Sequence, residues 1–250
     1  MAHDQDLGDE PPPAWRDKAP DIRTPIDAGA PVSGHRAPRA GPVGPSQAPE
    51  QDWVAAQKVL IPVLRPSGTP GTRLDQIDPE RLASEGMKSH ASPLLDLGPC
   101  GLMVGYVLRA DAFDIHVNAD HLLAWGVPPQ GVRAVAMANM ALWSTTAPWT
   151  EESSGLRRLL SSASGGGCDA ARVLLPDVRA HIASELGSDV RVLVGIPDRD
   201  LLVAGTLSDE DPEFAALFAE FIRSHADDAD QPLDRRVLEL VGGELRPFEG

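Results

Sequence analysis

The sequence predicts an α+β fold: a mostly antiparallel sheet built from hairpins, with helices packed on it, preceded by a disordered N-terminal tail. Short apolar segments of strand length follow one another in adjacent pairs, and helical segments separate these pairs. A doubly wound parallel sheet would instead alternate single strands with helices. The first 50 residues hold ten of the 24 prolines and few bulky apolar side chains. We therefore expect a disordered, proline-rich tail at residues 1–50 and a single α+β domain at residues 51–250.

The first strand is expected at residues 59–64, where Pro62 suits an edge strand. Residues 65–95 are rich in proline and glycine and predict a long irregular segment, with one helical turn after Asp78. A buried strand follows at residues 102–108. It turns back into residues 113–117, whose strict alternation predicts that the apolar side chains face inward and that Asp114 and His116 face outward.

Two helices are predicted next. Asp120 is placed to cap a helix over residues 121–125, which Gly126 ends. Residues 129–143 then carry an apolar stripe at helical spacing. Asn139 lies on that stripe, where a polar side chain is costly unless its amide is hydrogen-bonded. A structural hydrogen bond is favoured there over a ligand contact.

The C-terminal part predicts two further hairpins and three helices. A loose Ser/Gly segment leads to the turn at residues 165–167, and Asp169 then caps a short helix. A helix opens at Pro176 and ends at Gly187. A hairpin is expected at residues 190–196 and 201–207. A strongly amphipathic helix starts at residues 211–212, and the chain ends in a hairpin at residues 237–241 and 244–248.

Composition restricts the class of partner. The formal net charge of the 250-residue chain is −15, which opposes binding to nucleic acid or to an anionic membrane surface. No apolar segment approaches the length of a membrane span. The first residues carry acids where a secretory signal needs a basic start, and Cys100 and Cys168 stand far apart without a ligand framework. These features predict a cytoplasmic protein with two free thiols.

Three clusters could carry chemistry, and each also has a structural interpretation. Around the first hairpin, a metal site would need five residues to converge: Asp111, Asp114, His116, Asp120 and His121. Their spacing matches no metal-ligand motif, so a solvated hairpin face is favoured and no metal ligand is predicted. The glycine turn could form an anion cradle, or Cys168 could be activated at a helix start. A flexible turn followed by a cap is the favoured interpretation.

The third cluster is the turn at residues 197–200, where Asp198 and Asp200 flank Arg199. The two carboxylates could act as an acid/base or cation-binding pair, although proline and aspartate are also ordinary turn residues. The candidate binding residues are thus Asn139, Asp169, Asp198, Arg199 and Asp200. No catalytic residue, metal or cofactor is predicted.

The order of several short segments resembles the YtpQ-like family of bacterial proteins of unknown function. The resemblance spans roughly residues 59–248 and rests on these segments: IPVLR at 61–65, YVL at 106–108, AMAN at 136–139, CDAARVL at 168–174, VGIP at 194–197 with DLL at 200–202, PL at 232–233 and GELRPF at 243–248. Asn139, Asp169 and Asp200 match the family pattern. The family typically has Tyr in place of Cys168 and His in place of Asp198. The resemblance implies a bacterial cytosolic domain and no particular reaction.

Two function classes follow from these observations. The first is a non-enzymatic cytosolic binding or interaction domain, because no nucleophile and base, metal-ligand set or phosphate motif stands out. Its partner is an unknown protein or small molecule, and neither nucleic acid nor a membrane is expected. The alternative is a hydrolase or transferase whose carboxylate and amide site consists of Asp169, Asn139 and Asp200.

Overall fold

A computed structural model describes residues 48–86, 88, 90–110, 113–187 and 190–250. The predicted tail therefore lies outside the described residues, except for its last three positions. At those positions, the indole Nε1 of Trp125 donates a hydrogen bond of 2.8 Å to the carbonyl oxygen of Pro49. Residues 48–50 thus contact the folded part of the chain.

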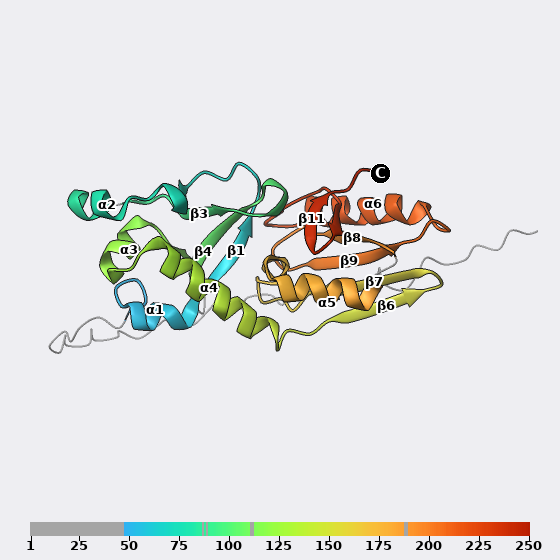
Figure 1. Cartoon of the computed structure of the whole chain (residues 1–250), viewed down its shortest axis with the longest axis horizontal. Helices are drawn as coiled ribbons and strands as arrows, with labels where there is room; N and C mark the ends of the chain where they lie inside the picture. Colours follow the sequence, from blue (N-terminus) through green and yellow to red (C-terminus); the bar gives the residue numbers. More distant parts are fainter. Residues whose placement is uncertain (1–47, 87, 89, 111–112, 188–189) are drawn as a thin grey trace, which may run out of the picture. The chain divides into compact units, whose positions relative to one another are not determined.

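The α+β fold is confirmed: the chain forms two mostly antiparallel sheets with helices packed against them (Figure 1). The first sheet has the order β1-β4-β3-β2, and β5 also pairs with β4. Its strands are β1 Leu60–Arg65, β2 Thr72–Arg73, β3 Leu94–Leu97, β4 Met103–Arg109 and β5 Asp114–His116. Only the short β2–β3 pair is parallel among the described strands.

The second sheet is antiparallel throughout and has the order β11-β10-β8-β9-β7-β6. Its strands are β6 Thr150–Ser154, β7 Arg157–Ser162, β8 Arg191–Gly195, β9 Leu202–Leu207, β10 Leu238–Val241 and β11 Glu244–Pro247. The predicted hairpins at residues 190–207 and 237–248 are the β8–β9 and β10–β11 pairs, so both predictions are confirmed.

The helices follow the apolar patterns in the sequence. The α-helices are α1 Trp53–Val59, α2 Pro79–Glu85, α3 Ala119–Trp125, α4 Pro129–Ser144, α5 Pro176–Leu186 and α6 Glu213–Asp228, and the 3-10 helices are η2 Leu74–Gln76, η3 Pro99–Gly101 and η4 Ala170–Leu174. As the stripe predicts, α4 buries Val132, Ala136 and Met140. None of the helices in the described ranges is long and apolar enough to cross a membrane.

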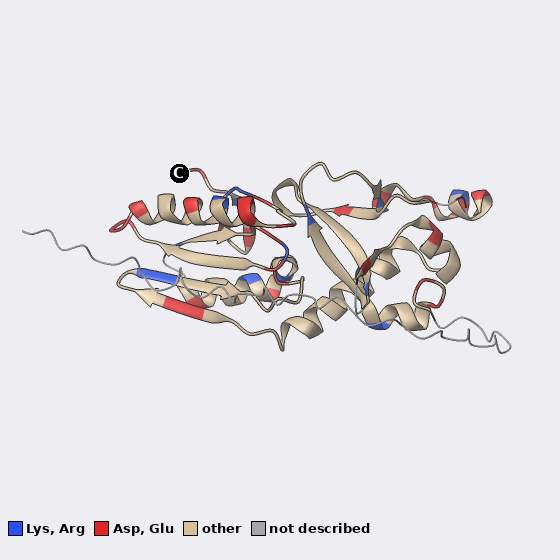
Figure 2. Ribbon diagram, turned by 180° about the vertical axis from the view of Figure 1, so that it is seen from behind, with Lys and Arg blue, Asp and Glu red and all other residues tan. Residues whose placement is uncertain are grey.

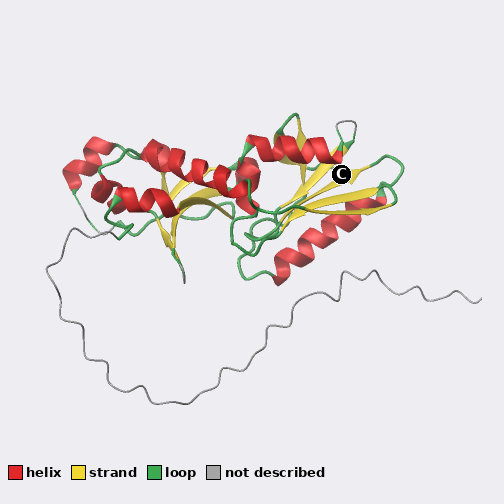
Figure 3. Cartoon of the chain, turned by 90° about the horizontal axis from the view of Figure 1, so that it is seen from below, coloured by secondary structure: helices red, strands yellow, loops and turns green. Residues whose placement is uncertain are grey.

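Alternation along β8 and β9 explains why helices cover both faces of the second sheet (Figure 3). Val192 and Val194 join one buried cluster with α5, whereas Leu193 between them joins a second cluster with Phe218 of α6. Because side chains alternate across a strand, α5 and α6 lie on opposite faces. Helix α6 carries the acidic residues Glu213, Glu220, Asp227 and Asp228, and its acidic positions are visible as repeated red bands in Figure 2.

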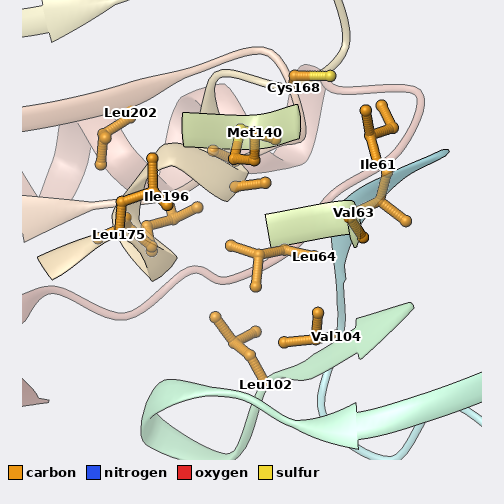
Figure 4. Packing of buried hydrophobic residues seen from close by; sticks show 14 of the residues in the cluster. Ile61, Val63, Leu64, Leu102, Val104, Met140, Cys168, Leu175, Ile196 and Leu202 are labelled. Carbon is orange, nitrogen blue, oxygen red and sulfur yellow. The ribbon is translucent and has the colours of Figure 1, made fainter. Parts of the chain in front are cut away.

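The larger buried cluster is shared between the two sheets. It contains Ile61 of β1, Met140 of α4 and Leu202 of β9, with Cys168 between them in sequence and fully surrounded at 2% exposure (Figure 4). Burying apolar surface stabilises a fold in proportion to its area, so this shared cluster holds both sheets in one packed core.

Several local predictions were wrong. The segment before Gly165 is not loose, because residues 150–162 form the β6–β7 hairpin. Strand β2 lies inside residues 65–95, which were expected to be irregular, β3 begins at the end of that segment, and α1 precedes the first strand. Every residue of β6 is exposed, so no apolar alternation marks it in the sequence.

Two predicted helix caps also differ. The α3 cap is Asn118, whose side chain accepts from His121 N at 3.2 Å while His121 Nδ1 accepts from Asn118 N at 3.1 Å. Asp120 Oδ1 instead forms a hydrogen bond of 2.6 Å with Nδ1 of His90. Asp169 stands at the start of η4 but makes no capping hydrogen bond. Asn118 is the better cap because it and His121, three residues later, exchange two hydrogen bonds, each from a backbone N–H to the other residue's side chain.

Candidate functional site

A cavity of about 690 Å³ lies against one face of the first sheet. The glycine turn and the β8–β9 turn close it from the second sheet. Its walls carry residues from six segments: Val63, Leu64 and Arg65; Val107, Arg109 and Ala110; Phe113, Asp114 and His116; Gly165, Gly166 and Gly167; Arg199 and Asp200; and Gln231. Cavities of this volume are typical of small-molecule sites.

The strand register explains why charged side chains share the sheet face of this cavity. Arg109 pairs with Asp114, and Val107 pairs with His116. Cross-strand partners lie on the same face of a sheet, and so do residues two apart on one strand. Arg65 belongs to this face as well, because Ile61 pairs with Val107 and Arg65 is four residues further along β1.

Asp114 and His116 were expected to face solvent, and this prediction was wrong. Both are half-buried and line the cavity, whereas Phe113, expected inside, is 65% exposed. The alternation places Asp114 and His116 on one face as predicted, but it fails at Phe113, which precedes β5 and also lines the cavity. The polar face points into a cavity rather than into bulk water, since the turns of the second sheet cover that face.

Arg199 connects the two sides of the cavity. Its guanidinium donates to Asp114 Oδ2 at 2.7 Å, to the Gly167 carbonyl oxygen at 3.2 Å and to Gln231 Oε1 at 3.2 Å. Gly167 has a φ of +69°, and a Cβ there would lie 2.6 Å from Arg199 Nη2. Glycine is therefore required both for the backbone conformation and for the close approach of the guanidinium.

The turn itself is held by Asp200 and Ser164. The Gly167 N–H donates to Asp200 Oδ1, and the Gly166 N–H donates to Ser164 Oγ at 3.3 Å. These two N–H groups already have acceptors, so they are not free to cradle an anion. The predicted turn at residues 165–167 thus shapes the wall of the cavity by presenting Asp200 and Arg199.

Arg65 and Arg109 differ from Arg199 because neither forms an ion pair within the described ranges. Arg65 donates to His116 Nε2, and Arg109 Nη2 lies 2.6 Å from the Sγ atom of Cys168. Burial lowers the pKa of Arg65, the neighbouring Arg199 guanidinium lowers it further, and Asp114 acts in the opposite direction. The cavity therefore holds cationic groups at an electrostatic cost.

His116 adds no charge to the cavity near pH 7. Burial, and then the Arg65 guanidinium, lower the pKa of His116, so the ring is neutral near pH 7. Since Nε2 accepts from Arg65, the proton lies on Nδ1, which is buried and has no hydrogen-bond partner among the described atoms. Arg199 is paired to Asp114, whereas Arg65 and Arg109 have no carboxylate partner among the described residues, so these two guanidiniums remain for an anion.

The predicted binding residues have separate roles. Arg199 and Asp200 line the cavity. Asp198 does not line it: its Oδ1 accepts from Asp200 N at 2.7 Å, and its backbone bridges to Pro232. Asp198 therefore shapes the turn that presents the other two.

Asp169 and Asn139 lie elsewhere. Asp169 is fully buried and accepts from the hydroxyls of Ser162 at 2.5 Å and Ser164 at 2.7 Å. Asn139 Nδ2 donates to the carbonyl oxygens of Gln57 at 2.7 Å and Leu60 at 2.8 Å, which joins α4 to the α1–β1 junction. Neither residue lines the cavity. No hydrogen bond in the described structure connects either of them to Asp200.

Cys168 is a poor nucleophile. Its thiol is 2% exposed, and burial raises its pKa, although the Arg109 guanidinium acts in the opposite direction. Of the five residues considered for a metal, Asp111 lies outside the described residues, and the others form no group of three ligands with any described His, Cys, Asp or Glu.

Sequence reasoning missed Arg65 and Arg109 as site residues, and it considered Asp114 and His116 only as metal ligands. Each arginine is the last residue of a buried strand, and this position is the signal that could have indicated them. Comparison with protein-family models, curated proteins and solved structures gives no match for the chain. The resemblance to the YtpQ-like family stays a prediction.

Proposed function

We propose that the protein is a non-enzymatic cytosolic binding domain whose cavity holds a small anionic molecule. The observation that carries this proposal is the pair Arg65 and Arg109, two guanidiniums on one sheet face with no carboxylate partner in the described structure. The chain has 37 Asp and Glu against 22 Lys and Arg, so carboxylates are numerous enough to pair with every arginine. Leaving two cavity arginines without one is costly unless an anion binds there.

The convergence of the cations supports one shared site. His116 pairs with Val107, and Asp114 pairs with Arg109, so these two cross-strand rows are neighbours on the same face. Such rows repeat about every 7 Å along a strand. The guanidinium of Arg65 contacts the first row at His116, and that of Arg199 contacts the second row at Asp114. All three arginines therefore reach one region of the cavity.

Thermal unfolding with and without anions tests this function. At about 100 times the Kd, a ligand stabilises the folded state by about 2.7 kcal/mol, which raises the Tm of a chain of this size by about 5–10 °C. We expect this shift in sodium phosphate relative to sodium chloride at equal ionic strength. The R65Q,R109Q double variant should lose the shift, whereas R223Q, on the exposed face of α6, should keep it.

The stability of the ligand-free variants separates binding from structure. Because Arg65 is half-buried beside another guanidinium, R65Q should unfold at the same or a higher temperature than the parent. A shift that survives the double variant, or the absence of any anion-dependent shift, would refute the proposal. Turnover that depends on Asp200, Asp169 and Asn139 would favour the hydrolase or transferase alternative.

A further inference from the structure

The cavity is much larger than the anion that its arginines would bind. Its volume is about 690 Å³, whereas one water molecule accounts for about 30 Å³ of liquid and a phosphate ion has the volume of only a few waters. A site built for inorganic phosphate alone would enclose it more closely. The remaining space implies that the anionic group belongs to a larger organic molecule.

The cationic end favours phosphate over carboxylate. A carboxylate is planar and is satisfied by one bidentate arginine. Here Arg65 and Arg109 belong to two different strands and reach the cavity from separate positions on its sheet face, and the ring of His116, which accepts from Arg65 through Nε2, has an unpartnered Nδ1. A tetrahedral group with three outer oxygens can accept from several donors in different directions at once, which matches this arrangement.

The opposite wall carries groups that recognise hydroxyls. Asp200 uses Oδ1 for the Gly167 N–H, and Gln231 uses Oε1 for Arg199. Asp200 Oδ2 and Gln231 Nε2 have no hydrogen bond to another described residue, and both side chains line the cavity. A carboxylate oxygen accepts from a hydroxyl and an amide nitrogen donates to one, so these groups complement a molecule with several hydroxyls.

We infer, on the basis of the proposed function, that the ligand is the phosphate monoester of a polyhydroxylated small molecule. Its phosphate binds between Arg65 and Arg109, and its hydroxyls bind Asp200 and Gln231. The carboxylate of Asp200 repels a second anionic group at that end. The site therefore selects a ligand with one charged end and one neutral, hydroxyl-rich end.

Calorimetric titration of the full chain tests this assignment. The panel contains inorganic phosphate, glucose 6-phosphate, ribose 5-phosphate, glycerol 3-phosphate, unphosphorylated glucose and succinate. We expect at least one phosphate monoester to bind tenfold or more tightly than inorganic phosphate, and glucose to show no binding. D200N and Q231A should reduce the affinity for that ester at least fivefold and leave the affinity for inorganic phosphate within twofold.

The outcomes distinguish the two proposals. If inorganic phosphate or succinate binds through Arg65 and Arg109 but no ester binds tenfold more tightly than inorganic phosphate, the ligand assignment is overturned and the anion-binding function stands. Equal loss of ester and phosphate affinity in D200N and Q231A also overturns the assignment. If no member of the panel binds, both proposals fail. Far-UV circular dichroism and the Tm of each variant verify that it folds.

Discussion

Replacing Gly167 by alanine should cost more stability than the same change at Gly165. The two glycines have nearly equal φ angles, +69° and +71°, in the left-handed region. A Cβ at Gly167 would lie 2.6 Å from Arg199 Nη2, whereas a Cβ at Gly165 would meet no atom within 4 Å. The pair thus isolates the contact with Arg199 from the backbone strain that both variants share.

The size of the difference follows from what Arg199 would lose. Holding an L-residue in the left-handed region costs about 1–2 kcal/mol, which is the full expected effect of G165A. In G167A the flexible guanidinium must also move away from Gly167, and its bonds to the Gly167 carbonyl, Gln231 and Asp114 weaken. Each such bond contributes about 0.5–1.5 kcal/mol. We therefore expect G167A to be about 1–3 kcal/mol less stable than G165A.

Urea unfolding followed by tryptophan fluorescence and far-UV circular dichroism measures this difference. The m values of the two variants should agree, so that a change in midpoint reports stability alone. G167A should also bind phosphate at least fivefold more weakly than G165A, because the displaced Arg199 no longer neutralises Asp114, whose carboxylate then repels the anion. Equal stability of the two variants would show that the packing of Arg199 on Gly167 contributes nothing.

Three further predictions concern residues around the site. R172M should lower the free energy of unfolding in urea by about 3–5 kcal/mol. Arg172 is 1% exposed, donates hydrogen bonds to Ser144 and Ser162, and packs 4.0 Å from the centre of the Trp149 ring. A loss below about 1 kcal/mol contradicts this prediction. N139A should lose about 1–3 kcal/mol, since two buried carbonyl groups lose their donor, with unchanged phosphate affinity; weaker binding would place Asn139 in the site. Burial lowers the pKa values of His116 and His121, so the unfolded chain binds more protons below about pH 6.5 and stability falls as the pH drops; H116Q,H121Q should flatten this slope in urea titrations from pH 8 to 5, and an unchanged slope refutes the assignment.

The elements that the sequence predicts well are those whose apolar faces contact the core. Helix α4 repeats buried residues at helical spacing, which leaves a clear period in the sequence, and the β8–β9 hairpin is buried on both faces, which leaves two continuous apolar runs. The β6–β7 hairpin shows the opposite case. Strand β6 is exposed at every position and is held by its ladder to β7, and a backbone ladder leaves no pattern of side chains to detect.

The predicted site residues fall into two groups: those that line the cavity and those that are hydrogen-bonded within the core. Arg199 and Asp200 are close in sequence and lie in a turn, so local chemistry alone indicates that they share a site. Asn139 and Asp169 were candidates because a polar residue stands out among apolar neighbours. Their hydrogen bonds to the α1–β1 junction and to Ser162 show that this signal also marks polar groups satisfied within the core.

Arg65, Arg109 and His116 reach one cavity only because of the strand register. A shift of β1 by one residue against β4 would turn Arg65 to the other face of the sheet and leave the cavity with one fewer cation. Sequence patterns predict which residues alternate but not which strands pair, so such a shift cannot be recognised before the fold is known. The anion site is therefore a property of the β1–β4–β5 pairing. Changes that weaken this pairing should reduce anion affinity even where they leave all three side chains intact.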